Sequence, residues 1–99
     1  MPGFGRYAVY ILTSRKYGPL YTGVTGNLIN RLVVHREELL EGFTARYHLH
    51  QLVYFELYDD PSDAILREKR IKKWRRDWKI ALIEKENPEW DDLFDKVIG

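Results

Sequence analysis

The stretch YAVYIL at residues 7–12 and the stretch LYTGV at residues 20–24 decide the fold of this chain. Both are short and rich in β-branched and aromatic residues, a composition typical of strands. The polar loop between them contains a glycine-proline breaker and is short enough for the two segments to pair as a hairpin. Such a hairpin places Tyr10 and Tyr21 on neighbouring strands.

The segments after the hairpin are predicted to form helices and one further strand. Apolar residues at helical spacing predict a helix over residues 28–41, capped by Asn27 and stopped by Gly42. Residues 42–50 lack such a pattern and are expected to form a loop. The later predicted elements are an alternating strand at 51–58 with Val53, Phe55 and Leu57 on one face, helices over 61–73 and about 76–86, and a short last helix carrying Trp90, Leu93, Phe94 and Val97.

The order of these elements is strand, strand, helix, strand, helix, helix, which indicates an α+β fold with helices packed against a small sheet. The chain has 99 residues and a mass of 11.9 kDa, near the lower end of single-domain size. No repeat, low-complexity tract or linker interrupts it. Residues 1–99 are therefore expected to form one domain with room for one functional site.

The composition excludes several chemistries. The chain has no cysteine, so disulfides, thiol nucleophiles and cysteine-ligated metals are impossible, and any metal must be held by oxygen or imidazole. The first residues lack the order of a signal peptide, and no apolar run approaches the roughly 18 residues that a spanning helix needs. A cytoplasmic protein without membrane association is expected.

The formal net charge of +1 conceals two segregated segments. Residues 67–79 hold eight of the sixteen cations and two acids, a balance of +6, whereas residues 84–99 carry a balance of −4. The basic segment is interleaved with Trp74 and Trp78, which suits contacts with phosphates and stacking on bases. A solvated basic helix face is the alternative interpretation.

Three residues in the predicted helices stand out. Arg31 and His35 share one stripe with Glu38 at the border of the apolar arc; they either lean over the sheet or form a surface charge ladder. Glu68 falls within the apolar face of Ala64, Ile65 and Ile71, where an unpaired carboxylate is costly. Glu68 is therefore either half of a buried ion pair, with an arginine for example, or a metal ligand.

The chain resembles the GIY-YIG nuclease family in the order and spacing of its motifs. They are Ala8-Val9-Tyr10, Tyr21-Thr22-Gly23, Arg31, His35, Glu68 and Asn87, and the small stand-alone bacterial members are the most similar. Ala8 and Thr22 replace the usual glycine and isoleucine, and Val24 stands where the repair nuclease of the family has a lysine. The resemblance implies a three-stranded antiparallel sheet flanked by helices and a metal-dependent endonuclease.

The resemblance also implies a role for each matching residue. Glu68 would hold one Mg²⁺ or Mn²⁺ ion, and Arg31 would neutralise charge on the phosphoryl oxygens. Tyr21 would take the proton of the attacking water, helped either by the nearby ion and Arg31 or by a relay to His35. Tyr10 would position the water or phosphate, and Asn87 would brace the site.

The expected substrate is DNA rather than RNA, selected by strand structure and not by base sequence. One alternative is a nucleic-acid-binding module of the same fold with weak or no turnover, and another is a protein-interaction domain that uses the acidic, aromatic tail around Trp90 and Phe94. The residues expected to contact the nucleic-acid backbone are Arg46, Lys69, Lys72, Lys73, Arg75 and Arg76.

Overall fold

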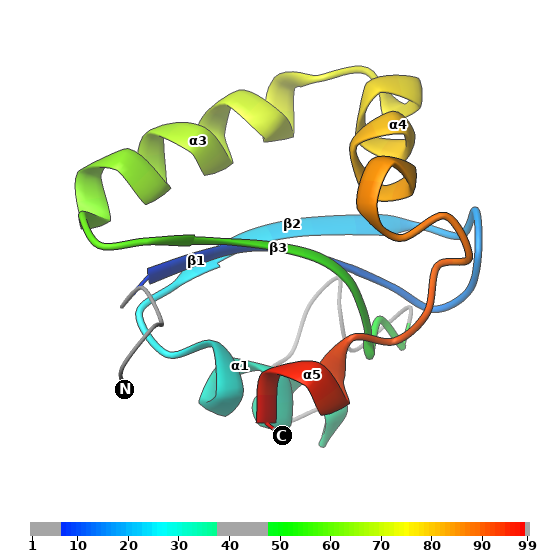
Figure 1. Cartoon of the computed structure of the whole chain (residues 1–99), viewed down its shortest axis with the longest axis horizontal. Coiled ribbons are helices and arrows are strands. Elements are labelled where there is room, and N and C mark those ends of the chain that lie inside the picture. The colour runs from blue at the N-terminus through cyan, green and yellow to red at the C-terminus, as the bar shows by residue number, and fades with distance from the viewer. Residues whose placement is uncertain (1–6, 38–47, 99) are drawn as a thin grey trace.

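The computed structural model describes residues 7–37 and 48–98. Its strands form one antiparallel sheet in the order β2-β1-β3, so β2 is an edge strand (Figure 1). The predicted α+β architecture with a three-stranded antiparallel sheet is confirmed. The elements are β1 (Tyr7–Thr13), β2 (Leu20–Thr25), α1 (Leu28–Arg36), β3 (Gln51–Tyr58), α3 (Pro61–Lys73), α4 (Arg76–Glu86) and α5 (Phe94–Ile98).

Helices cover both faces of the sheet. In Figure 1, α3 and α4 lie on one side, and α1 and α5 lie together on the other. Successive residues of a strand point to opposite faces, so β1 contributes to both cores. Tyr10 packs with Leu32 of α1 in one hydrophobic cluster, whereas Ile11 packs with Ala64 and Ile71 of α3 in the other.

A β-bulge in β3 corrects the predicted alternation. Tyr54 pairs with Ile11 and Leu52 pairs with Leu12, which leaves Val53 as the extra residue opposite β1. Val53 and Tyr54 consequently join the same core cluster, on the α3 side. Strict alternation had placed these neighbours on opposite faces of the strand.

The predicted helix starts are confirmed, but two other boundaries differ from expectation. Asn27 and Asp60 accept hydrogen bonds from the first turns of α1 and α3. α1 ends at Arg36, and the rest of the predicted helix at residues 38–41 lies outside the described residues, as do Gly42 and Arg46. Trp90 precedes α5 with a φ of 60°, so it is not part of the last helix.

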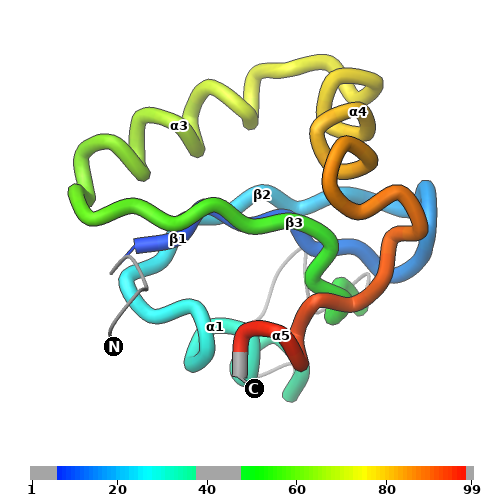
Figure 2. The backbone as a smooth tube through the Cα atoms, viewed as in Figure 1, coloured from blue at the N-terminus to red at the C-terminus, as the bar shows by residue number. Residues whose placement is uncertain are grey.

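α3 and α4 are separate helices, a point that the sequence pattern left open. Trp74 and Arg75 both adopt extended backbone, with ψ angles of 152° and 155°. The chain therefore leaves α3 and turns down into α4 across the end of the sheet (Figure 2). No helix in residues 7–37 and 48–98 is long and apolar enough to cross a membrane.

Candidate active site

Three aromatic side chains meet on the α1 side of the sheet. The Tyr10 hydroxyl and His35 Nε2 share a buried hydrogen bond of 3.2 Å. The Tyr21 ring lies 6.2 Å from the Tyr10 ring and 5.7 Å from the His35 ring, measured between centroids. His35 is only 4% exposed, so it is not part of a surface charge ladder. The predicted placement of Tyr10 and Tyr21 on neighbouring strands is confirmed, and of the two alternatives for His35 the structure shows the one in which it leans over the sheet.

Gly23 leaves the space that the Tyr10 ring occupies. Gly23 is the β2 partner of Tyr10, and a Cβ atom there would lie 2.6 Å from both Cζ and the hydroxyl oxygen of Tyr10. It would also lie 2.9 Å from Cε2 of Tyr21. The absent side chain of Gly23 therefore lets the buried Tyr10 ring lie across β2, the edge strand next to β1.

We expect Gly23→Ala to disrupt this cluster. The added methyl group must displace a Tyr10 ring that packing and His35 hold in place, and such overpacking costs about 2 kcal/mol of unfolding free energy. Urea unfolding measures the loss. Gly26→Ala is the matched control, because its Cβ would lie 3.5 Å from Tyr7, an ordinary contact. Equal stability of the two variants would contradict the crowding at Gly23.

Burial sets the protonation of the cluster at neutral pH. It raises the pKa of Tyr10 well above its usual value, and the neighbouring Tyr21 adds to the rise while Arg31 opposes it. It lowers the pKa of His35, and the positive charge of Arg31 lowers it further. Tyr10 is therefore protonated and His35 is neutral. This pair joins a hydroxyl proton to an imidazole able to accept it.

Arg31 is half-buried on α1 one turn before His35. Its charge acts on the ionisation of both Tyr10 and His35, which places it beside the cluster. A guanidinium stays protonated at any relevant pH and presents a fork that matches two phosphate oxygens. Arg31 thus gives the cluster a permanent positive charge.

Glu68 lies on α3, on the other side of the sheet, and is 7% exposed. Its charge still raises the pKa of the Tyr10 hydroxyl, so the carboxylate acts electrostatically on the cluster. Its Oε2 atom forms an ion pair of 2.5 Å with Nζ of Lys72, one helical turn further on. The partner is therefore a lysine and not an arginine. Ile65, expected on the same buried face, is 44% exposed.

A divalent ion at Glu68 would have one protein carboxylate. No group of three or more His, Asp or Glu side chains able to hold a metal occurs within residues 7–37 and 48–98. Mg²⁺ commonly keeps several waters and binds through one or two carboxylates together with substrate phosphates, so a single carboxylate fits it. Lys72 stands at that carboxylate, and its side chain is half exposed and long enough to move away.

Asn87 is not brought to the aromatic cluster. Its amide nitrogen donates to the carbonyls of Val53 and Asp91 at 3.0 and 2.9 Å, and its amide oxygen accepts from the Asp91 backbone at 3.0 Å. Val53 is the extra residue of the β3 bulge. Asn87 thus ties the chain after α4 to the strand that pairs with β1.

Some cations of the basic segment 67–79 contact other groups of the protein, whereas others are exposed on the helix surface. Arg76 donates to the carbonyls of Tyr17 and Gly18, and Arg75 lies over the Trp78 ring. Lys72 pairs with Glu68. Lys69 and Lys73 are exposed on α3.

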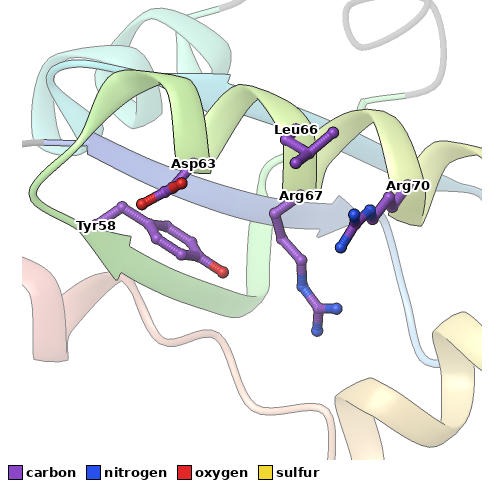
Figure 3. Close-up of a pocket in the computed structure, with 5 residues that line it drawn as sticks. All are labelled: Tyr58, Asp63, Leu66, Arg67 and Arg70. Atoms are coloured by element: carbon purple, nitrogen blue, oxygen red, sulfur yellow. The ribbon is translucent and has the colours of Figure 1, made fainter.

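A carboxylate network on β3 was not singled out from the sequence. Glu56 accepts hydrogen bonds from the hydroxyls of Tyr54 and Tyr58 and a bidentate bond from Arg67. These bonds lower the pKa of Glu56, although burial alone raises it. Beside it lies a pocket of about 330 Å³, into which α3 projects Arg67 and Arg70 (Figure 3); its other lining residues are Tyr58, Asp63 and Leu66.

Comparison with known proteins identifies the family. The model of the GIY-YIG catalytic domain matches residues 6–81. A UPF0213 protein of Staphylococcus saprophyticus is 35% identical over 78 residues, which cover 79% of this chain and 94% of the relative. A UPF0213 protein of Clostridium perfringens is 37% identical over 91 residues, covering 92% and 96%. One of Syntrophus aciditrophicus is 39% identical over 71 residues, covering 71% and 80%.

No solved structure matches the chain. The region matched by the family model contains Tyr10, Tyr21, Arg31, His35 and Glu68, and the three aromatic residues among them meet in space. The chain therefore belongs to the GIY-YIG family of nuclease-type catalytic domains and is related within it to the small UPF0213 proteins.

Proposed function

We propose that this protein is a nuclease that hydrolyses phosphodiester bonds, with DNA as its substrate and selection by strand structure. The observation that carries the proposal is the Tyr10–His35 hydrogen bond beside Tyr21 and Arg31, next to the edge strand β2. A protonated hydroxyl, a neutral imidazole and a fixed guanidinium are the groups needed to remove a proton from water near a phosphate. In the proposal Glu68 holds one Mg²⁺ or Mn²⁺ ion, which polarises the scissile phosphate when bound.

The aromatic cluster supplies a route for the proton. Tyr21 accepts a proton from the attacking water as its own proton moves to the Tyr10 hydroxyl, whose proton passes to Nε2 of His35. The water oxygen then forms a bond to phosphorus, and the bond from phosphorus to the leaving oxygen breaks. The leaving oxygen takes a proton from solvent. This route avoids a free tyrosinate in a buried setting, where burial disfavours the charged form.

Arg31→Met is expected to lower kcat/KM by about 10²-fold, because the fork stabilises charge that develops in the transition state. Single-turnover cleavage of labelled DNA measures the change. Arg36→Met is the matched control on the same helix, since Arg36 faces α5 through Asp92 and Phe94. A larger loss of activity in the control than in Arg31→Met would contradict the role of Arg31.

The titration of His35 tests its environment independently of activity. Burial first and Arg31 second lower its pKa from 6.5, so its NMR titration midpoint should lie below that value. Arg31→Met should raise the midpoint, because it removes a repelling charge. The folded pKa is lower than the unfolded one, so the free energy of unfolding should fall as the pH drops below 6.5. A midpoint above 6.5 would contradict a neutral, buried His35.

A binding module without turnover is the second candidate function. The Lys72 ammonium on the single carboxylate of the site favours it, because it neutralises the charge that attracts a metal. The burial of the tail argues against the other alternative, a protein-interaction domain that uses the acidic, aromatic tail. Trp90 is 3% exposed and Phe94 packs against the core, so these tail side chains are engaged inside the protein.

Cleavage assays distinguish the two candidates. Labelled single-stranded, flap and branched DNA are incubated with the protein and either Mg²⁺ or Mn²⁺, with chelator as the control. A nuclease gives metal-dependent products from at least one substrate. Binding with a steep salt dependence but no products under any condition would overturn the nuclease proposal and leave the binding module.

A further inference from the structure

A stack of rings and guanidinium groups lies at the break between α3 and α4. Trp74 and Trp78 meet edge to face, with ring centroids 6.0 Å apart. The Arg67 guanidinium lies 5.1 Å from the centre of the Trp74 ring, and that of Arg75 lies 5.2 Å from the centre of the Trp78 ring. The four side chains form a continuous surface, which we call the Trp78 platform.

The outer end of the platform is open to solvent. Trp78 is 52% exposed, although a tryptophan ring is among the most costly side chains to leave in water. The Arg75 side chain is also largely exposed, and its weak ion pair with Asp77 has a length of 3.4 Å. Trp74, in contrast, packs against the core and fixes the inner end. The Trp78 ring thus has Arg75 over it and Trp74 beside it, and about half of its surface stays open to solvent among the described residues.

The charge around the platform selects for an anionic partner. The segment 67–79 carries eight cations against two acids. The pKa of Lys79 is lowered by its burial and by the charges of Arg76 and Lys72, so these cations crowd one region. Through Arg67 the platform continues into the pocket of Figure 3, where Arg70 adds another guanidinium. An apolar protein partner would have to cover these charges, whereas a phosphate backbone pairs with them.

We propose that the Trp78 platform binds an unpaired base of single-stranded DNA by stacking, with the surrounding cations on its phosphates. Every base has a π-face, so stacking on an exposed tryptophan is tolerant of sequence but requires a base that has left the duplex. The inference deepens the proposed function, on which it rests for its substrate class. It predicts that the preferred DNA has an unpaired nucleotide beside the bond to be cut.

The platform is close enough to Glu68 to serve the same strand. Lys73, the last residue of α3, follows Glu68 by five residues, a rise of about 7.5 Å along a helix, and Trp74 comes directly after it. Lys72 lies between them and pairs with Glu68. A strand whose base stacks on Trp78 therefore passes its phosphates near the carboxylate of the candidate site.

The test is a binding measurement in chelator, where no cleavage occurs. Fluorescence titration compares a labelled dT oligonucleotide with the duplex that it forms with its complement, for wild type and Trp78→Leu. The wild type should prefer the single strand, and Trp78→Leu should weaken single-strand binding about tenfold or more while changing duplex binding little. Trp78→Phe should restore part of the affinity. Binding of the single strand should also quench the tryptophan fluorescence of the wild type, and this quenching should disappear in Trp78→Leu.

Two controls separate stacking from charge and from general apolar loss. Lys73→Gln should weaken the binding of both DNA forms and reduce the slope of log affinity against log salt concentration. Trp78→Leu should leave that slope unchanged. Ile29→Ala, at a half-exposed apolar residue of α1 on the opposite side of the sheet, should have no effect. Unchanged single-strand affinity of Trp78→Leu, or an equal loss for both DNA forms, overturns the platform. A preference of more than tenfold for the matching RNA overturns the assignment to DNA.

These results are distinguishable from failure of the nuclease proposal. A protein that binds the single strand through Trp78 but never cleaves it supports the platform and refutes the nuclease. A protein that cleaves duplex and single strand alike, with no change in Trp78→Leu, refutes the platform alone.

Discussion

Glu68→Gln should lower the rate of metal-dependent cleavage by about 10³-fold or more. A bound divalent ion contributes several kcal/mol of charge stabilisation in the transition state, and each 1.4 kcal/mol corresponds to about tenfold in rate. Glutamine keeps the size of the side chain and removes the charge that attracts the ion. Nucleic-acid binding should persist, because Lys72 loses its carboxylate and becomes available to phosphates. Single-turnover cleavage at saturating DNA measures the rate.

Two further variants make this prediction specific. Glu86→Gln removes an exposed carboxylate at the end of α4 and should cleave as the wild type does. Lys72→Met removes the ammonium that competes with the metal, so half-maximal cleavage should need less Mg²⁺. A Glu68→Gln rate within tenfold of the wild type, in a protein with an unchanged melting temperature, would rule out Glu68 as the ligand.

Sequence patterns predicted the elements well because their signals are local. Alternating and β-branched residues marked the strands, and the side chains of Asn27 and Asp60 cap the helices that follow them. The proximity of Tyr10 and Tyr21 followed from a hairpin with one short loop. These features depend on neighbours along the chain, which a sequence displays directly.

Tertiary features were predicted less well. The β3 bulge at Val53 has no sequence mark of its own, because the residue is an ordinary strand former whose register depends on β1. The burial of His35 and the exposure of Ile65 depend on how far each helix rotates against the sheet, which periodicity locates only approximately.

Two interactions could have been found from the sequence. Lys72 lies four residues after Glu68, the spacing of a helical ion pair, and this spacing indicates it as the partner. Tyr54, Glu56 and Tyr58 alternate along one strand, and this spacing indicates that the two hydroxyls share a face with the carboxylate. Arg67, which completes that network from α3, required knowledge of the packing.

The site and the bulge are linked through β1. Tyr10 is adjacent to Ile11, and the irregular register with β3 falls between Ile11 and Leu12. A bulge leaves backbone groups without ladder partners, and the Val53 carbonyl is satisfied by the Asn87 amide instead. We therefore expect any bracing by Asn87 to act on the backbone of β3, the strand that pairs with β1.

Asn87→Ala should therefore lower the free energy of unfolding by about 3 kcal/mol. The change removes three hydrogen bonds and leaves the buried Val53 carbonyl and the part-buried Asp91 amide unpaired, at a cost of about 1–3 kcal/mol for each unsatisfied buried group. For a domain of this size the loss corresponds to a fall of about 12–24 °C in Tm. Urea unfolding and thermal melting measure the two quantities.

Asn87→Asp separates the hydrogen bonds from the loss of volume. Aspartate keeps the acceptor for the Asp91 amide but turns the other oxygen toward two carbonyls, so it should destabilise the protein at neutral pH at least as much as alanine does. Protonation at acid pH restores a donor and should narrow its gap to the wild type. Asn30→Ala, at an exposed position of α1, should change stability by less than about 0.5 kcal/mol. If Asn87→Ala is no less stable than Asn30→Ala, the bulge is held by other contacts and Asn87 has no bracing role.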